Sequence, residues 1–247
     1  MNNKKAKITE TQVYGFESAI RGSRNPMDSW HLSDSCICSS YKGLCEDCKL
    51  YNEEEETCEE KYGENPYILG EKDLGLAQKL IKAGNEHAKF MRMIQVWADI
   101  NLPRYFWSEF DTYKFNSKNS CSTMHKLLNK KHEITLDMFE YSEEDKDIVE
   151  SIIKRLNEIR EQFLQSNGEQ QRILKRRAKQ LLPEGMLQLR TINTNYAELR
   201  NMVLQRLHHQ LKEEWQEVFC KWVTELPYAK ELIFCGIEDE YERLKSL

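Results

Sequence analysis

The length and charge of the chain narrow the classes of protein to which it can belong. With 247 residues it can bury a substantial core in one large or two small domains. Its net charge of −5 gives no overall basic field for nucleic acid or an anionic membrane. No apolar run approaches the ~20 residues that span a bilayer, and the polar N-terminus lacks the apolar core of a signal peptide. We therefore expect a cytoplasmic protein with no membrane or nucleic-acid partner.

The first predicted element is a weak strand over 11–16, which leads into a turn. The turn contains Gly22 and Pro26, together with Arg21 and Arg24. Two guanidinium groups this close in sequence could contact an anion. The alternative is that both are solvated charges on a loop, as most loop charges are. The sequence alone leaves both interpretations open.

Residues 31–66 are predicted to be an insertion, because the segment is rich in acidic residues and has little apolar periodicity. Five of the eight cysteines of the chain lie in it, namely Cys36, Cys38, Cys45, Cys48 and Cys58. In a cytoplasmic chain these should be reduced thiols, which favours a metal role over disulfides. We predict that the first four bind one Zn²⁺, with Cys58 as a substitute ligand, since zinc would supply folding energy that the segment lacks. The alternative is an acidic loop with reduced cysteines.

The centre of the chain predicts a helix, a strand and a second short helix. Apolar residues on one face, closed by Gly84, predict a helix over 73–84. Apolar and polar residues alternate over 94–102, which is typical of a half-buried strand. Pro103 should begin a short aromatic helix, because proline is tolerated at the first helical position. The polar stretch from Glu109 to His125 suits ligand contact or a capped turn.

The C-terminal half predicts two long helices with a strand between them. A capping-box pattern at Ser142 announces a helix that ends near Gly168. The basic segment 168–183 could meet a phosphate, or it could form a solvated helix face. Alternation over 186–193 predicts a strand that pairs with the one at 94–102. A wide apolar stripe then predicts one continuous helix over 196–224.

Two groups of motifs occur in the order known from an enzyme family. The first group is Glu86-His87-Ala88-Lys89-Phe90 followed by Ser117-Lys118-Asn119-Ser120-Cys121-Ser122. The second is Leu182-Pro183 followed by Asn195, Asn201 and Arg206. Each motif is weak by itself, but their shared order and intervals carry weight. Over roughly residues 70 to 225 the chain resembles the flavin-dependent thymidylate synthases.

The resemblance implies an α/β, thymidylate synthase-complementing-like fold: a sheet packed with long helices, in a single domain over 1–247 that carries the Cys-rich insertion. It also implies a homotetramer that binds FAD and dUMP where subunits meet. By position, His87, Asn195 and Asn201 would contact the flavin. Asn119, Lys179 and Arg206 would contact the nucleotide. The catalytic candidates are Ser117, Ser122, Glu109 and Asp111.

The chain departs from the family at a basic triplet. Glu109-Phe110-Asp111 stands in place of the family's Arg-His-Arg, and Met124 stands where a nucleotide-binding arginine is found. Lys179 likewise replaces an arginine. Exchanging cations for carboxylates beside a phosphate removes attraction and adds repulsion. We therefore predict weak or absent methyl transfer to dUMP, with a nucleotide still bound.

Four hypotheses follow from these residues. The chain could be a working flavin enzyme with nucleotide and folate chemistry, in which the flavin carries the hydride. It could catalyse another reaction, with a carboxylate as base among Glu109, Asp111, Tyr113, Lys114 and His125. It could be a non-catalytic scaffold that binds a nucleotide or a protein. Finally, the charged residues between 109 and 125 could be structural ion pairs in a turn.

Overall fold

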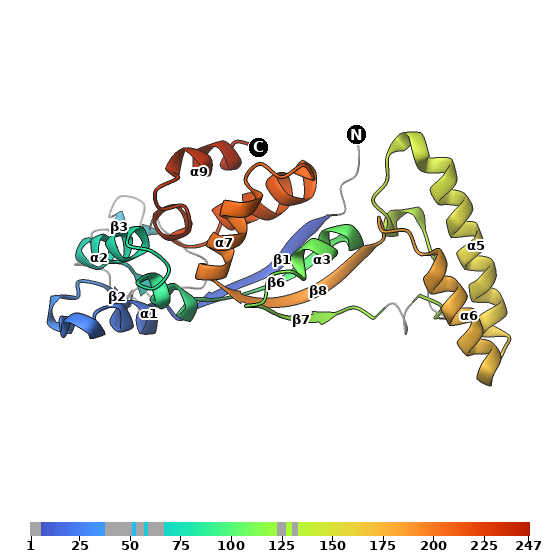
Figure 1. Cartoon of the computed structure of the whole chain (residues 1–247), viewed down its shortest axis with the longest axis horizontal. Helices are drawn as coiled ribbons and strands as arrows, with labels where there is room; N and C mark the ends of the chain where they lie inside the picture. Colours follow the sequence, from blue (N-terminus) through green and yellow to red (C-terminus); the bar gives the residue numbers. More distant parts are fainter. Residues whose placement is uncertain (1–5, 38–50, 53–56, 59–66, 123–126, 130–132) are drawn as a thin grey trace. The chain divides into compact units, whose positions relative to one another are not determined.

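The computed structural model describes residues 6–37, 51–52, 57–58, 67–122, 127–129 and 133–247 (Figure 1). The chain divides into two compact units. The hairpin unit contains Met1–Thr9, Asp99–Lys114 and Lys118–Ile192. The pocket unit contains Glu10–Ala98, Phe115–Ser117 and Asn193–Leu247. The single domain over 1–247 stays a prediction.

A four-stranded sheet has the strand order β1-β6-β8-β7. Its strands are β1 (Lys7–Tyr14), β6 (Gln95–Pro103), β8 (Leu187–Asn195) and β7 (Ser117–Ser120). β6 and β8 are neighbours, which confirms the predicted pairing of the two central strands. The alternation in β6 is also confirmed, because Val96, Ala98 and Ile100 are buried while Trp97 is exposed.

The hairpin unit has a core of its own beneath two helices. Its elements are α3 (Arg104–Phe110), η5 (Leu136–Met138), η6 (Glu143–Asp145), α5 (Lys146–Leu164) and α6 (Gly168–Leu181). Figure 1 shows α5 and α6 side by side, and Ile153, Leu156, Ile159 and Leu174 belong to one buried cluster. In the predicted aromatic helix α3, the Trp107 indole N–H donates to the carbonyls of Leu102 at 3.1 Å and Gln188 at 2.9 Å. These bonds satisfy the only polar atom of a fully buried ring.

The pocket unit is mainly helical. Its N-terminal elements are α1 (Phe16–Ser23), η1 (Asn25–Met27), η2 (Trp30–Leu32), β2 (Cys36–Ile37), β3 (Tyr51–Asn52), β4 (Thr57–Cys58), β5 (Tyr67–Ile68), α2 (Glu71–Lys82) and η4 (Ala88–Met93). Its C-terminal elements are α7 (Tyr196–Arg206), the π-helices η7 (Glu213–Cys220) and η8 (Ala229–Ile233), α8 (Lys221–Thr224) and α9 (Glu238–Lys245). Phe16 lies at the centre of the core, with its ring against those of Tyr67, Tyr196 and Tyr228.

The close approach of α1 to η4 depends on a glycine. Gly15, which precedes α1, has a φ of 99°, a conformation that side chains with a Cβ rarely adopt. A Cβ at this position would lie 2.3 Å from the carbonyl oxygen of Met93. Residue 15 therefore has to be glycine for α1 to pack against the end of η4.

A buried carboxylate ties α2 to the segment that follows α1. Asp73 is fully buried and pairs with the Arg24 guanidinium, and it also accepts the hydroxyls of Ser33 and Ser35, each at 2.6 Å. Burial alone would raise the pKa of the Asp73 carboxyl, but the hydrogen bonds from these serines and from Arg24 outweigh it and hold the pKa below its usual value. Arg24 is thus a structural residue, neither a solvated charge nor a ligand for an anion.

The ends of the predicted insertion lie side by side. β2 pairs with β5 in an antiparallel register that sets Cys36 opposite Ile68 and Ile37 opposite Tyr67. β3 and β4 form a second antiparallel pair. The insertion over 31–66 otherwise lies largely outside the described residues, so its extent stays a prediction.

The predicted continuous helix over 196–224 is wrong, because the chain breaks after α7. The Leu211 N–H donates to Nδ1 of His209 at 3.2 Å, and the Gln216 side chain donates to the His209 carbonyl at 3.2 Å. These bonds turn the chain between α7 and η7, where a helix would use backbone partners instead. Apolar residues keep a helical spacing across the break at Leu207 and Leu211, so periodicity could not reveal it.

Candidate functional site

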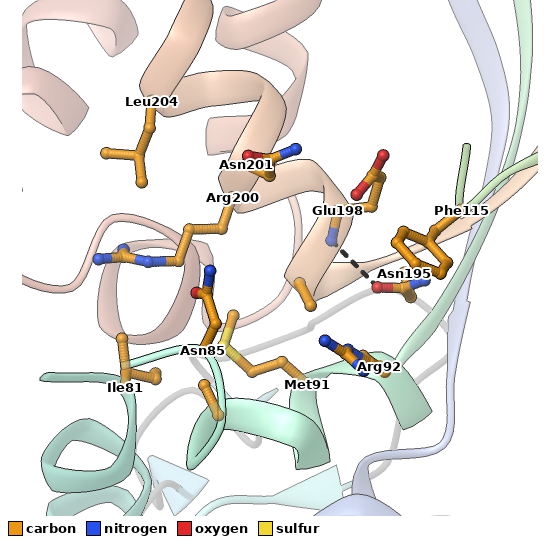
Figure 2. A pocket seen from close by; sticks show the side chains of 12 residues that line it. Ile81, Asn85, Met91, Arg92, Phe115, Asn195, Glu198, Arg200, Asn201 and Leu204 are labelled. Carbon is orange, nitrogen blue, oxygen red and sulfur yellow. Dashed lines mark hydrogen bonds between the residues drawn. The ribbon is translucent and has the colours of Figure 1, made fainter. Parts of the chain in front are cut away.

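A pocket of about 230 Å³ in the pocket unit lies between η4 and α7 (Figure 2). We call it the η4–α7 pocket. Its polar lining consists of Asn85, Arg92, Asn195, Glu198, Arg200 and Asn201, and Met91 and Phe115 are among its apolar walls. All of these residues belong to one unit, so the geometry of the pocket is set within that unit.

The start of α7 is fixed by three hydrogen bonds beside the pocket. The Asn195 side chain caps the helix, because its oxygen accepts the Glu198 N–H at 3.0 Å. The Tyr196 N–H donates to the Ile94 carbonyl at 3.1 Å, which joins α7 to the segment after η4. The Thr194 hydroxyl donates to the Phe115 carbonyl at 3.3 Å. The cap and these two bonds hold Asn195 and Phe115 in place at the pocket wall.

Two guanidinium groups enter the pocket region from different elements. Figure 2 shows the Arg200 side chain extending toward Ile81, whereas Arg92 lies on the other side of Met91, near Asn195. Arg200 is half-buried and donates to the Ile233 carbonyl at 2.5 Å, and burial lowers its pKa, although an arginine still remains charged. The Arg92 guanidinium lies 5.8 Å from the centre of the Phe115 ring.

Several polar groups of the pocket have no protein partner within the described part of the chain. There, the Glu198 carboxylate makes no hydrogen bond or ion pair, although the residue is only 6% exposed. Nor do the side-chain NH₂ groups of Asn195 and Asn201 donate to any described residue, whereas the Asn201 side-chain oxygen accepts from the Gln205 side chain at 2.8 Å. Guanidinium, amide and carboxylate groups together can bind a polar ring that both accepts and donates hydrogen bonds.

The pocket brings together two of the three predicted flavin contacts. Asn195 and Asn201 both line it, whereas exposed His87 lines a second pocket beside α1. The predicted phosphate ligand Arg206 is the last residue of α7, and its guanidinium lies 4.5 Å from the centre of the Trp215 ring. Arg206 is not part of the η4–α7 lining. The predicted roles of these four residues stay predictions.

Asp111 belongs to a charged cluster in the hairpin unit, which we call the Asp111 cluster (Asp111, Lys118 and Arg190). Arg190 donates to both carboxylate oxygens, at 3.0 and 3.1 Å, and the Lys118 ammonium lies 2.8 Å from one of them. Burial alone would raise the pKa of Asp111, but hydrogen bonds from Lys118 and Arg190 lower it below its usual value. The Arg190 guanidinium also lies 4.3 Å from the centre of the Trp107 ring. Asp111 is therefore ionised and already neutralised by two cations.

The other catalytic and substrate candidates lie on or near β7, α3 and α6. Ser117 and Asn119 are exposed on β7, and Ser122, just beyond it, is half-buried. Among the described residues, the hydroxyls of Ser117 and Ser122 make no hydrogen bond, so none of those residues is placed to activate either hydroxyl as a nucleophile. Glu109 on α3 and Lys179 on α6 are half-buried. Their predicted roles also stay predictions, and His125 lies outside the described residues.

Sequence reasoning missed Arg92, Glu198 and Arg200. A helical spacing could have indicated Arg200, because residues 197, 200, 201 and 204 fall on one face of α7 and Asn201 was already a candidate. Nothing in the sequence around Arg92 shows that η4 faces α7. Contacts of this kind depend on the fold.

The zinc prediction rests largely on residues that the structure does not describe. Cys38, Cys45 and Cys48 lie outside the described residues, and Cys36 is exposed on β2. Within the described ranges, no group of three or more His, Cys, Asp or Glu side chains could hold a metal ion. Zinc therefore stays a prediction. In the same ranges, no helix has the length and apolar character required to cross a bilayer.

No protein-family model and no curated protein matches this sequence. Solved structures do match the fold. A crystal structure of thymidylate synthase X from Helicobacter pylori with FAD and dUMP has a TM-score of 0.62 and 16% identity, covering 96% of this chain and 99% of that one. A second structure, of flavin-dependent thymidylate synthase ThyX from the same organism complexed with FAD and dUMP, has a TM-score of 0.60 and 16% identity, with coverages of 92% and 97%. The predicted fold class is therefore confirmed: a mixed helix and sheet architecture like that of the flavin-dependent thymidylate synthases.

Proposed function

We propose that this chain is a divergent relative of the flavin-dependent thymidylate synthases, and that it binds a nucleotide or flavin ring in the η4–α7 pocket. One observation carries the proposal. Asn195 and Asn201, which the motif resemblance assigns to the flavin, line one pocket. Arg92 and Arg200 also line it, on opposite sides of Met91. The fold likeness to enzymes solved with FAD and dUMP supports the same assignment.

The size and chemistry of the pocket fit one polar ring. A volume of about 230 Å³ is below the roughly 300–1,000 Å³ of pockets that enclose a drug-sized ligand. A dinucleotide such as FAD would therefore place a single ring there and extend its remainder outward. The amides of Asn195 and Asn201 would donate to ring carbonyls, and the Glu198 carboxylate would accept from a ring N–H. A bound flavin would supply hydride transfer, a chemistry that no side chain provides.

We propose that thymidylate synthesis is weak or absent. The family's Arg-His-Arg is replaced by Glu109, the buried Phe110 and Asp111. The two cations nearest Asp111 are already bound to its carboxylate, so they are less available to a phosphate than unpaired arginines would be. Lys179 and Arg206 remain the proposed phosphate ligands. The alternative function is a non-catalytic scaffold that binds a nucleotide or another protein.

Location and assembly are also part of the proposal. As in our interpretation of the sequence, we propose a cytoplasmic protein that assembles as a homotetramer.

Two assays test the proposal together. Isothermal calorimetry with FAD, riboflavin 5′-phosphate and dUMP should show saturable binding of at least one of them. NADPH oxidation in the presence of FAD, dUMP and a methylene-folate should be slow or undetectable. Binding without turnover would support the proposal. Robust turnover would show that the altered triplet is compensated, and absence of heat with all three ligands would leave the protein-interaction scaffold.

A further inference from the structure

A second and larger pocket in the pocket unit lies beside α1 and η4. Of the predicted ligand contacts only His87 lines it, and the proposed function places no ligand there. We call it the Trp30 pocket. Its volume of about 770 Å³ falls in the range typical of small-molecule sites. Residues from α1, η1, η2 and η4 form its walls, including Arg21, Met27, Trp30 and Met93. Its lining shares no residue with that of the η4–α7 pocket.

Large apolar side chains are exposed in this pocket. Met27 is 48% exposed, Trp30 48% and Met93 47%. Single apolar residues on a surface are ordinary, but three that come from three elements and line one hollow mark a binding surface. Methionine sulfur and methyl groups adapt to the face or edge of an aromatic ring. The walls therefore favour a flat apolar ligand.

The Trp30 indole is held in one orientation. Its ring N–H donates to the Asn25 side-chain oxygen at 2.8 Å. The 3-10 turn that carries it is closed by backbone bonds from Leu32 to Ser29 and from Ser33 to Trp30, at 3.1 and 3.0 Å. A side chain that is already fixed loses little conformational entropy when a ligand stacks on it. Trp30 therefore serves as a ready platform for a ring.

Charge in the pocket favours an anion. Arg21 and Arg24 are three residues apart, yet Arg24 is buried against Asp73, while the Arg21 guanidinium has no hydrogen bond or ion pair within the described ranges. The other ionisable residues of the wall are Glu86, Lys89 and the exposed His87; the Lys89 ammonium lies 3.2 Å from the Glu86 carboxylate, so this pair adds no net charge. Arg21 is thus a charged donor that a carboxylate or phosphate can engage.

We propose that the Trp30 pocket binds a planar aromatic or heteroaromatic ring that carries a carboxylate or phosphate. The ring stacks on Trp30 beside Met27 and Met93, and the anionic group pairs with Arg21. Stacking on an aromatic side chain and a charge-assisted hydrogen bond then act on two ends of the same ligand.

A matched pair of small probes tests this proposal without a nucleotide. 2-Naphthoate has the ring and the anion, whereas 2-naphthamide has the ring and no charge. Binding is followed in ¹⁵N-labelled full-length protein by the indole N–H signal of Trp30, assigned with Trp30→Phe. We expect 2-naphthoate to shift this signal saturably and to bind about tenfold more tightly than 2-naphthamide, as one charge-assisted bond implies.

Substitutions separate the two contacts. Arg21→Gln should weaken 2-naphthoate about tenfold and leave 2-naphthamide within about twofold. Trp30→Ala should weaken both probes, since stacking is independent of charge. Arg176→Gln, at an exposed arginine of α6, is the control for loss of one positive charge. Thermal melts establish that each variant is folded.

The outcomes distinguish this site from the η4–α7 pocket. Arg92→Ala lies in the other lining and should leave naphthoate binding unchanged. The proposal is overturned if millimolar 2-naphthoate leaves the Trp30 signal in place, if both probes bind equally, or if Arg21→Gln behaves like Arg176→Gln. None of these naphthoate results bears on the binding of FAD or dUMP, which calorimetry measures separately.

Discussion

The Asp111 cluster and the η4–α7 pocket both contain carboxylate and guanidinium side chains, but these differ in whether they are paired with other protein groups. In the Asp111 cluster, one carboxylate is bound by Arg190 and Lys118. In the η4–α7 pocket, Glu198 has no ion pair with Arg92 or Arg200 within the described part of the chain. A polar group that lines a pocket without a protein partner is available to a ligand, whereas a paired charge is not. We infer that charges paired with other protein groups are structural, whereas polar groups without a described protein partner mark the ligand site.

The largest expected effect concerns the most completely engaged charge, Asp73. Asp73→Ala would leave the guanidinium of Arg24 buried without its partner, so we expect a loss of about 3–5 kcal/mol in the free energy of unfolding. Urea denaturation measures this loss. Ser33→Ala, which removes one of several hydrogen bonds to the same carboxylate, should cost less, about 1.5 kcal/mol. If Asp73→Ala and Ser33→Ala both cost about 1 kcal/mol or less, the Arg24–Asp73 pair is not structural.

The same residue predicts how stability depends on pH. The pKa of Asp73 is lower in the folded chain than its value of about 3.9 in an unfolded one. Its contribution is therefore complete above that unfolded pKa and is lost as the pH falls through the folded pKa. Urea midpoints measured across this acid range should fall more steeply for the natural chain than for Asp73→Ala. Parallel curves would contradict the assignment.

A smaller effect is expected at Asp111. Its side chain is 44% exposed, so its ion pairs are screened by solvent, and Asp111→Asn should cost about 1 kcal/mol or less. If Asp111 is structural, the substitution should leave ligand affinity within about twofold in calorimetry. A large loss of ligand affinity with stability unchanged would instead place Asp111 in the ligand site.

Local sequence patterns predicted the regular elements but not the contacts between them. Alternation along 94–102 and the proline at 103 were enough for β6 and α3, because each signal is contained within a few residues. Asp111 and Arg190 are 79 residues apart, so their pairing depends on the fold. At the break after α7 the His209 side chain accepts the Leu211 N–H, a contact that does not alter the apolar period.

The candidate site was only partly predictable for the same reason. Asn195 and Asn201 were found by their spacing, and both line the η4–α7 pocket. Arg92 comes from η4, about a hundred residues earlier in the chain, and only the packing of η4 near α7 places it there. Similarly, the sequence could not tell Arg21 from Arg24, because Asp73, the partner of Arg24, is 49 residues away.

Calorimetric titration of FAD into two arginine variants tests the central claim most directly. Arg92→Ala removes an open guanidinium of the η4–α7 pocket, and Arg190→Ala removes an engaged one from the Asp111 cluster. We expect Arg92→Ala to weaken FAD about tenfold, as loss of a charge-assisted bond implies, and Arg190→Ala to change it by no more than about twofold. If Arg190→Ala weakens FAD more than Arg92→Ala does, the ligand lies at the Asp111 cluster and the assignment of the η4–α7 pocket is wrong.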